Sequence, residues 1–254
     1  MHWSHDELMH ELLIVPRRAF LPWSGTEVIE RPGWLQLVTP SFRQGGLNEV
    51  VYAQLDASEA DAVIDATLAR YRELGLRFRW TVTPDCRPAD LGERLEQRGL
   101  ERTELLGMVR TTDEVPEQDE VRIERVGLAN LSEYLATVGA GWGLDPAPFE
   151  PYARAQLADP IARYALFLAR VGEQPVAIAG CIAFERSLYL QGGVVLPEFR
   201  QRGIYRALTH ARLRYAASRG LGLVTTHALR SSSAPLLERL GFRSLVDFAS
   251  YRGR

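Results

Sequence analysis

The chain has 254 residues, of which 46% are hydrophobic and 24% charged, a balance typical of a globular protein with one large domain or two smaller ones. All 30 basic residues are arginine, so the chain lacks the lysine of a P-loop NTPase, a protein kinase or a Schiff-base enzyme. No apolar run is long enough to span a membrane and no signal-peptide pattern is present, so we expect a cytoplasmic location. The only cysteines, Cys86 and Cys181, form no CxxC motif, and we expect no disulfide scaffold and no metal site.

Charge is divided unevenly along the sequence. Residues 1–120 carry 13 arginines and 22 acidic residues, whereas residues 121–254 carry 17 and 10. A basic C-terminal half suits a polyanionic small molecule. Attraction between two oppositely charged halves is the alternative, and the two interpretations are compatible.

Predicted helices and strands alternate through the first 110 residues. In chain order they are a helix over Asp6–Val15, strands over Glu27–Val38 and Asn48–Leu55 around a loop at Ser41–Gly46, a helix over Ser58–Leu74, a strand over Arg77–Val82, a helix over Ala89–Arg98 and a strand over Leu100–Arg110. Ser58 is the candidate N-cap of its helix, and Pro32-Gly33 interrupts the first strand. The charged stretch Thr111–Glu120 contains Pro116 and is the predicted linker.

The second half follows a similar order. Its elements are a strand over Val121–Arg125, helices over Ala129–Val138 and Pro148–Leu157 joined through Gly139–Asp145, strands over Tyr164–Arg170, Val176–Phe184 and Tyr189–Leu196, a helix from about Arg200 to Arg219, a strand over Leu221–Ala228, a helix over Ala234–Leu240 and a last strand to Tyr251. Gly192 and Gly193 lie inside one of these strands and predict a bulge.

The junction after that strand has the chemistry of a phosphate site. Pro197 ends the strand, and a short turn with Arg200 and Gly203 opens the next helix. Glycine allows close approach to the backbone, and a helix start offers unpaired amide N–H groups and a positive dipole end to an anion. Arg202 and Arg206 add full positive charges beside this turn.

This junction resembles the acyl-CoA-binding core of the GNAT superfamily of N-acyltransferases. Val195-Leu196-Pro197, Arg200 and Gly203 match the family pattern of Val-x-Pro followed by Arg/Gln-x-x-Gly-x-Gly/Ala, and Arg239-Leu240-Gly241-Phe242 resembles a common family ending of the next helix. Tyr205 departs from the pattern, which has a small residue there. The resemblance covers roughly residues 121–252, about half of the chain.

An internal repeat extends the resemblance to the first half. The segment ATLARYRELGLRFRW parallels HARLRYAASRGLGLV, which pairs Tyr71 with Tyr215 at an offset of about 140 residues, and Gly99 pairs with Gly241 further on. The first copy has acids and no Arg-x-x-Gly before its helix. We therefore expect an α/β (α+β) fold of two GNAT-like domains, each a mixed, mostly antiparallel sheet flanked by helices: residues 1–115 form a degenerate domain without the CoA motif and residues 120–254 the acyl-CoA-binding domain.

The resemblance implies acetyl-CoA as acyl donor and assigns site residues by position. The donor-binding residues are expected to be Val194, Val195, Leu196, Arg200, Gln201, Arg202, Gly203, Ile204, Tyr205 and Arg206. The acceptor-binding residues are expected to be Trp142, Phe149, Tyr189 and Gln191.

The proton-transfer groups are less clear. Family members often use a glutamate near the bulged strand as base and a tyrosine in the last helix as acid, but this strand has no glutamate and Leu237 stands at the tyrosine position. The candidates that remain are Glu185, at the end of the preceding strand, and His227, because an unperturbed histidine side chain titrates near neutral pH. Both stay open.

The sequence therefore predicts an N-acetyltransferase that acts on a primary amine of a small molecule or peptide. The alternative is an acyl-CoA-binding or regulatory module with impaired catalysis, because the usual acid and base are missing. We expect neither nucleic acid nor membrane as a partner, since the basic residues centre on one turn. The acceptor and the oligomeric state stay open.

Overall fold

The computed structural model describes residues 3–19, 25–43, 47–114, 117, 120–159 and 161–253. The chain divides into two compact units that are each discontinuous in sequence. Unit 1 comprises Met1–Leu21, Met108–His227 and Pro235–Ser244, and unit 2 comprises Pro22–Gly107, Ala228–Ala234 and Leu245–Arg254. The division of the chain into a first repeat, residues 1–115, and a second repeat, residues 120–254, stays a prediction. The two compact units do not coincide with these repeats, because the N-terminal segment belongs to the unit that holds most of the second repeat and the C-terminal segment belongs to the unit that holds most of the first.

Unit 2 is built on a mixed sheet, which has both antiparallel and parallel strand pairs. Its strands are β1 (Glu27–Arg31), β2 (Trp34–Val38), β3 (Glu49–Ala53), β4 (Phe78–Val82) and most of β11 (Arg243–Gly253), in the order β1-β2-β3-β4-β11. The strand predicted over Glu27–Val38 is two antiparallel strands, because Pro32-Gly33 turns β1 back onto β2, and Gly33 has a φ of +75°. Helices α2 (Ala60–Glu73) and α3 (Leu91–Gln97) cover this sheet, and Trp80, Tyr71 and Leu95 are fully buried in the core.

The last strand of the chain completes unit 2. β11 runs antiparallel to β4, with Ala249 opposite Val82 and Tyr251 opposite Trp80. Both Ala249 and Tyr251 belong to the buried core of this unit.

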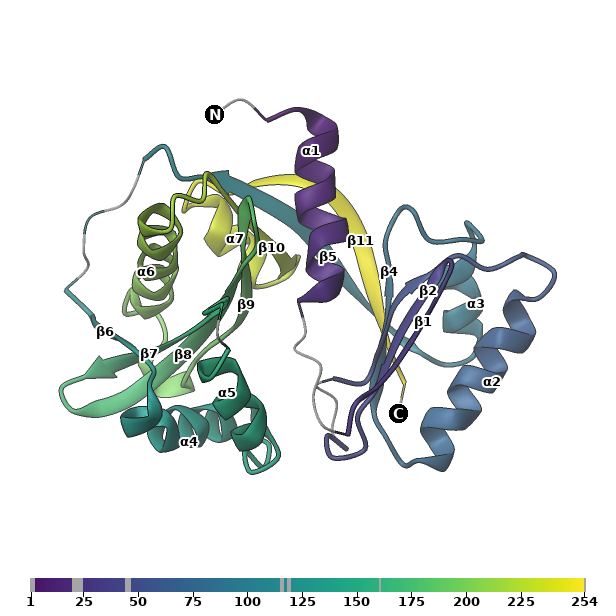
Figure 1. Cartoon of the computed structure of the whole chain (residues 1–254), viewed down its shortest axis with the longest axis horizontal. Coiled ribbons are helices and arrows are strands. Elements are labelled where there is room, and N and C mark those ends of the chain that lie inside the picture. The colour runs from purple at the N-terminus through teal and green to yellow at the C-terminus, as the bar shows by residue number, and fades with distance from the viewer. Residues whose placement is uncertain are drawn as a thin grey trace. The chain divides into compact units, whose positions relative to one another are not determined.

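Unit 1 contains the predicted phosphate site. Its strands are the end of β5 (Glu101–Thr111), β10 (Leu223–Leu229), β9 (Ser187–Val195), β8 (Gln174–Ala183), β7 (Tyr164–Val171) and β6 (Arg122–Arg125), in that order. The pairs from β6 to β9 are antiparallel, and β9 and β10 are parallel. Helices α4 (Leu131–Trp142) and α5 (Phe149–Leu157) lie on one face of this sheet and α6 (Ile204–Ser218) on the other (Figure 1).

Short helical segments complete the inventory. They are α1 (His5–Met9), the π-helical turn η1 (His10–Ile14), the 3₁₀ turns η2 (Val15–Arg18), η3 (Leu128–Asn130) and η4 (Pro197–Phe199), and α7 (Ser233–Glu238). α1 and η1 confirm the helix predicted over Asp6–Val15, and they belong to unit 1.

Three boundary predictions are wrong. Ser58 does not cap α2, because its hydroxyl donates to the Asp56 carboxylate, and the helix begins one residue after Glu59. α4 continues through the predicted loop to Trp142 and ends at Gly143, whose φ of +64° terminates the helix. α6 begins at Ile204 rather than near Arg200. The predicted loop at Ser41–Gly46 and the linker lie partly outside the described residues.

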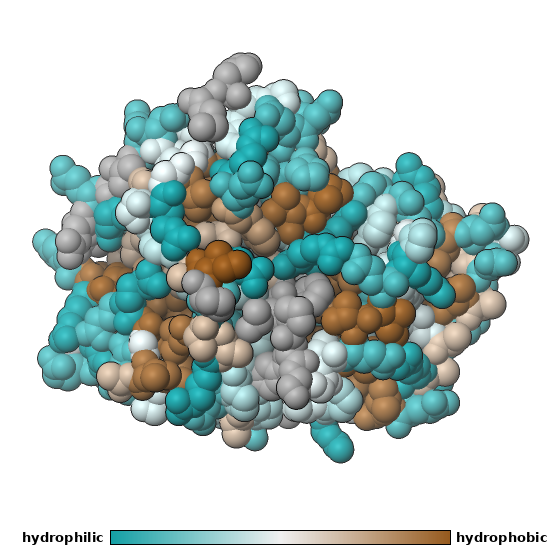
Figure 2. Space-filling view, in the orientation of Figure 1, coloured by the Kyte–Doolittle hydropathy of each residue, from teal (hydrophilic) through white to brown (hydrophobic). Residues whose placement is uncertain are grey.

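The surface in the view of Figure 2 has hydrophobic residues in separate groups between hydrophilic ones. Across the described ranges, no helix is long and apolar enough to cross a membrane. The same residues contain no cluster of histidine, cysteine and carboxylate side chains suited to a metal ion.

Candidate functional site

The predicted bulge in β9 is present. The register between β8 and β9 shifts so that Gly193 faces Ala179 and Gln191 faces Gly180, which leaves Gly192 as the extra residue with a φ of +45°. On the other side of β9, the pairing with β10 runs only from Ser187 to Leu190, whereas the pairing with β8 continues to Val195. The described part of β9 beyond Leu190 therefore has an open edge toward β10.

The turn that follows β9 has the backbone of an anion cradle. Gly203 is the N-cap of α6 with a φ of +75° and a ψ of 0°, and Gln201 also has a positive φ of 63°. A positive φ is costly for a residue other than glycine, and such strain concentrates at functional turns. A Cβ at Gly203 would make only an ordinary contact, 3.4 Å from a guanidinium nitrogen of Arg206, so the positive φ is what favours glycine here.

The arginines around the cradle are exposed at its rim. Arg200 donates from Nε to the carbonyl oxygen of Val195 at 3.2 Å, which ties the turn to the end of β9. The guanidinium of Arg202 lies 5.3 Å from the ring centre of Phe199. The first amides of a 15-residue helix thus lie next to a turn that carries three exposed arginines, which gives this end of the helix the positive charge that an anionic ligand requires.

Tyr205 points away from the cradle and into the protein. Its ring lies 3.8 Å from the position of a Cβ on Gly193, below the bulge. Burial raises the pKa of the Tyr205 phenol, and the neighbouring buried guanidinium of Arg212 partly opposes that shift. Ile204 is buried as well. The departure from the family pattern at Tyr205 therefore leaves the cradle accessible.

Two rows of side chains cross the α4 face of the sheet where β9 and β10 separate. The first row is Tyr164, Ile182, Tyr189 and Thr225, and the second is Leu166, Gly180 and Gln191. Gly180 has no side chain, and the side chains of Gln191 and Leu166 approach it: a Cβ there would lie 3.6 Å from a carbon of each. The hydroxyl oxygens of Tyr164 and Thr225 are buried without a hydrogen-bond partner among the described residues.

The structure brings several predicted acceptor residues to this face. Trp142 ends α4, is 43% exposed, and its ring lies 3.3 Å from a Cβ position on Gly192. Tyr189 contacts His227 edge to face, with 5.3 Å between the ring centroids. Phe149 instead packs against the buried core under α4 and α5.

His227 is held by the N-terminal segment of the chain. Its Nε2 lies 2.8 Å from the carbonyl oxygen of Leu12, a residue of η1. The sequence interpretation assigned no functional role to the N-terminal helix, because contacts between residues more than 200 positions apart leave no local pattern.

Glu185 lies at the end of β9 that is farther from the cradle. It is exposed in the turn before β9, at the opposite end of the strand from Gly192, and seven extended residues span roughly 20 Å. The structure therefore separates Glu185 from the bulge, and its catalytic role stays a prediction. Leu237 is 1% exposed in α7 and serves as a core residue.

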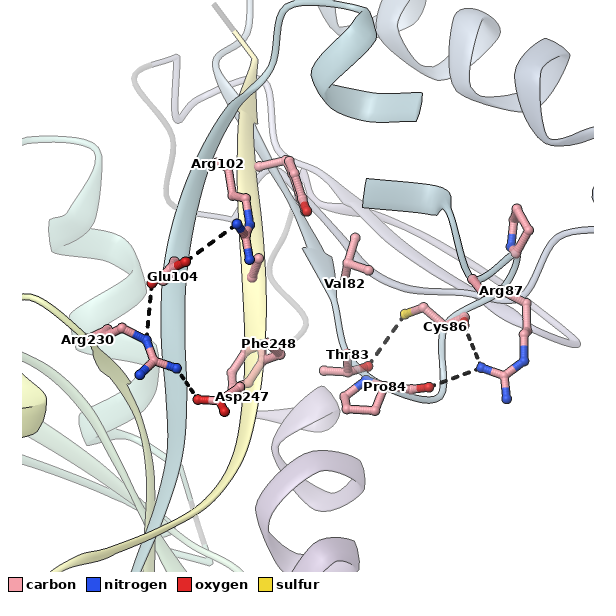
Figure 3. A pocket seen from close by; sticks show the side chains of 14 residues that line it. Val82, Thr83, Pro84, Cys86, Arg87, Arg102, Glu104, Arg230, Asp247 and Phe248 are labelled. Atoms are coloured by element: carbon pink, nitrogen blue, oxygen red, sulfur yellow. Dashed lines mark hydrogen bonds and ion pairs between the residues drawn. The ribbon is translucent and has the colours of Figure 1, made fainter. Parts of the chain in front are cut away.

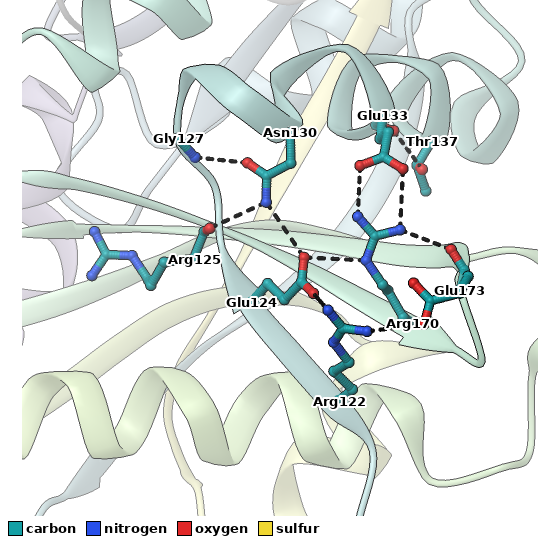
Figure 4. Close-up of polar contacts among 9 residues, drawn as sticks. All are labelled: Arg122, Glu124, Arg125, Gly127, Asn130, Glu133, Thr137, Arg170 and Glu173. Atoms are coloured by element: carbon teal, nitrogen blue, oxygen red, sulfur yellow. Dashed lines mark hydrogen bonds and ion pairs between the residues drawn. The ribbon is translucent and has the colours of Figure 1, made fainter.

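A network around Arg170 anchors the start of α4 (Figure 4). Arg170 donates to both carboxylate oxygens of Glu133 at 2.6 and 3.1 Å, and to Glu124 on β6 at 3.1 Å. The hydrogen bonds from Arg170 lower the pKa of Glu133. Burial raises the pKa of Glu124, but Arg170 and Arg122 outweigh it and the net shift is downward. The network positions the helix that ends at Trp142.

Unit 2 contains a separate cavity of about 330 Å³ (Figure 3). The loop after β4 forms one wall, and the linked ion pairs of Arg102, Glu104, Arg230 and Asp247 form the other. Cys86 lines it as well and is 4% exposed. None of the predicted site residues lines this cavity.

Comparison with known proteins agrees with the geometry. Residues 137–242 match the family model of the acetyltransferase (GNAT) family. A functionally unknown conserved protein from Staphylococcus epidermidis ATCC 12228 is similar at 17% identity over 91% of this chain and 95% of that chain, with a TM-score of 0.70. A GCN5-related N-acetyltransferase from Kribbella flavida is similar at 17% identity over 99% of this chain and 95% of that chain, with a TM-score of 0.65.

A tandem GNAT protein from the clavulanic acid biosynthesis pathway is also similar, at 15% identity over 95% of this chain and 87% of that chain, with a TM-score of 0.59. At such identities the solved structures show the fold alone. The comparison with curated proteins gave no match.

Proposed function

On the premise that residues 137–242 form an acetyltransferase domain of the GNAT family, we propose that the protein transfers an acetyl group from acetyl-CoA to a primary amine. The observation that carries this proposal is the combination of a bulged β9, open toward β10, with an anion cradle at its end. Membership of the family supports acyl transfer in general. The identity of the donor as acetyl-CoA and of the acceptor as a primary amine is our proposal.

In the proposed complex, the amides from Gln201 to Arg206 bind the pyrophosphate of the donor. The pantetheine arm follows the open edge of β9, and a backbone N–H near Val195 donates to the thioester carbonyl oxygen. Such a donor stabilises the negative charge that develops on that oxygen. The acceptor amine approaches from the face of Trp142, Tyr189 and Gln191.

The reaction forms a C–N bond and breaks the C–S bond. The attacking amine loses a proton, and the departing CoA thiolate gains one. We assign the proton acceptor to His227, because it lies one position beyond the last paired residues of β9 and β10. A thiol with a pKa near 8.5 is a tolerable leaving group at neutral pH, so a dedicated acid is not essential.

Two measurements test the proposal. Titration calorimetry should give one acetyl-CoA per chain. Acetyl-CoA at a concentration of 100 times its Kd should raise the free energy of unfolding by about 2.7 kcal/mol. Gly203→Glu should abolish that stabilisation by placing bulk and negative charge in the cradle. Unchanged binding by this variant would refute the assignment of the cradle.

The buried Leu237 and the distant Glu185 favour the second candidate, an acyl-CoA-binding or regulatory module with impaired catalysis. A panel of amines with acetyl-CoA separates the two functions. Release of free thiol above the hydrolysis background supports the transferase. Binding without release for any amine supports the module.

A further inference from the structure

Arg212 of α6 is a charged side chain in the interior of unit 1. It is 3% exposed, and no carboxylate among the described residues pairs with it. Burial lowers the pKa of this guanidinium, and the neighbouring Tyr205 and Cys181 side chains offset only part of that shift. A buried charge without an opposite charge is costly, and apolar side chains often replace buried charged groups without loss of stability. Packing alone therefore does not account for an arginine at this position.

The guanidinium of Arg212 joins α6 to the sheet. Its Nε donates to the Leu208 carbonyl at 3.1 Å, and one terminal nitrogen donates to the Gly180 carbonyl on β8 at 3.3 Å. Gly180 faces Gln191, the residue before the bulge of β9, and the register of the two strands shifts between Ala179 and Gly180. The hydrogen bond from Arg212 thus reaches β8 at the level of the bulge.

The same side chain reaches back to the first turn of α6. Its other terminal nitrogen donates to Thr209 Oγ1 at 3.3 Å, and that hydroxyl donates to the Tyr205 carbonyl at 2.9 Å. Positions 205, 209 and 212 lie on one stripe of the helix, because they are spaced by four and three residues. Thr209 is fully buried, so water does not compete for these bonds. Since Tyr205 follows the N-cap Gly203 by two residues, the hydrogen bonds lead from the cradle to the bulge.

This network gives a physical reason for the tyrosine at position 205, where the family pattern has a small residue. The Tyr205 phenol forms a hydrogen bond with Arg212, which opposes the effect of burial on the phenol. The Tyr205 ring lies beneath Gly193 of the bulge, 3.8 Å from the position of a Cβ there. A small side chain would leave this space unfilled and the guanidinium without its phenol partner.

We propose that the side chains of Tyr205, Thr209 and Arg212 are positioning groups that hold the anion cradle and the bulge of β9 at a fixed separation. This inference rests on the proposed function, in which one acetyl-CoA molecule places its pyrophosphate in the cradle and its thioester at the bulge. A ligand that contacts two points binds more tightly when the protein holds those points in place beforehand. The three side chains act through the backbone that they hold and not on the reacting atoms.

Two ligands separate this role from a general loss of structure. Acetyl-CoA spans the cradle and the bulge, whereas ADP carries the pyrophosphate without the pantetheine arm. We expect Arg212→Met to raise the Kd of acetyl-CoA about 10-fold and to leave the Kd of ADP unchanged, both measured by titration calorimetry. Arg214→Met is the matched control, because the hydrogen bond from Arg214 to the Glu117 carbonyl is exposed, and both Kd values should stay at the wild-type level.

Tyr205→Phe keeps the ring and removes only the hydroxyl. We expect it to raise the Kd of acetyl-CoA by less than Arg212→Met does, and to add little in the double variant, because both changes remove the same contact. Arg212→Lys retains a charged donor and should recover part of the affinity. Additive effects of Tyr205→Phe and Arg212→Met would contradict the pairing of these two side chains.

Hydrogen exchange gives a readout that needs no ligand. The amides of residues 191–195 should exchange faster in Arg212→Met than in Arg214→Met. Equal exchange in the two variants, an unchanged Kd of acetyl-CoA in Arg212→Met, or an equal loss of affinity for acetyl-CoA and ADP would overturn the positioning role. Faster exchange in a protein that binds neither ligand would support the positioning role and overturn the proposed donor site instead.

Discussion

Gly141 of α4 lies directly against Val194 of β9: a Cβ at Gly141 would stand 2.6 Å from a methyl carbon of Val194. This contact lets the end of α4 approach the bulge closely enough for Trp142 to cover Gly192. Glycine inside a helix costs stability relative to alanine, so here packing outweighs helix propensity.

We predict that Gly141→Ala destabilises unit 1 by about 1–3 kcal/mol through overpacking and raises the KM for the acceptor amine. Urea unfolding and steady-state kinetics measure the two effects. Gly127→Ala is the control, because a Cβ there meets nothing within 4 Å. Equal stability of the two variants would contradict the packing role of Gly141.

Gly203→Ala should cost about 1–2 kcal/mol, because the φ of +75° is unfavourable for a side chain with a Cβ. Gly203→Asn should cost less, since asparagine tolerates this conformation better. Both should weaken acetyl-CoA binding, measured by calorimetry. Gly75→Ala has a similar positive φ at the end of α2 in unit 2 and should lose stability without losing affinity.

Arg170→Met should make stability less dependent on pH below 5. Arg170 lowers the folded-state pKa of Glu133 and offsets the effect of burial on Glu124, so both carboxylates stabilise the fold above their unfolded pKa of about 4.3. That stabilisation is lost as pH falls from this value through the lower folded-state pKa. Urea midpoints at pH 7 and pH 3 should differ more in the wild type than in the variant. Arg154→Met, in an exposed pair, should behave like the wild type.

Both cysteines should resist thiol reagents in the folded protein. Cys86 and Cys181 are 4% and 1% exposed, and burial raises the pKa of the Cys181 thiol to about 12. Because the thiolate is the reactive form, we expect negligible labelling by a disulfide reagent at pH 8 and two labelled thiols per chain in urea. Rapid labelling of the folded protein would contradict this burial.

Local patterns in the sequence predicted most of the helices and strands, and the two adjacent glycines predicted the bulge that the structure confirms. The end of α4 was mispredicted, because Gly141 weakens helix propensity and the contact with Val194 that compensates is not local. The Leu12–His227 contact was missed for a related reason. It joins residues 215 positions apart, so no local pattern in the sequence marks it.

The assignment of catalytic residues was the weakest part of the sequence interpretation. Glu185 and His227 were about equally plausible in sequence, one at the end of the strand before the bulged strand and the other near the end of the strand after the donor-binding helix. The structure places Glu185 in the turn before β9 and His227 one residue beyond the last pair of β9 and β10, and the catalytic role of each stays a prediction.

The exchange of terminal segments has a consequence for biosynthesis. Ala249 and Tyr251, which complete the core of unit 2, are synthesised after every segment of unit 1, and unit 1 needs the N-terminal helix together with residues up to Ser244. Although domains generally fold in order during synthesis, unit 2 cannot complete its core until β11 has followed all of unit 1 out of the ribosome. A nascent chain stalled before β11 should therefore leave the buried face of Trp80 open to chaperones.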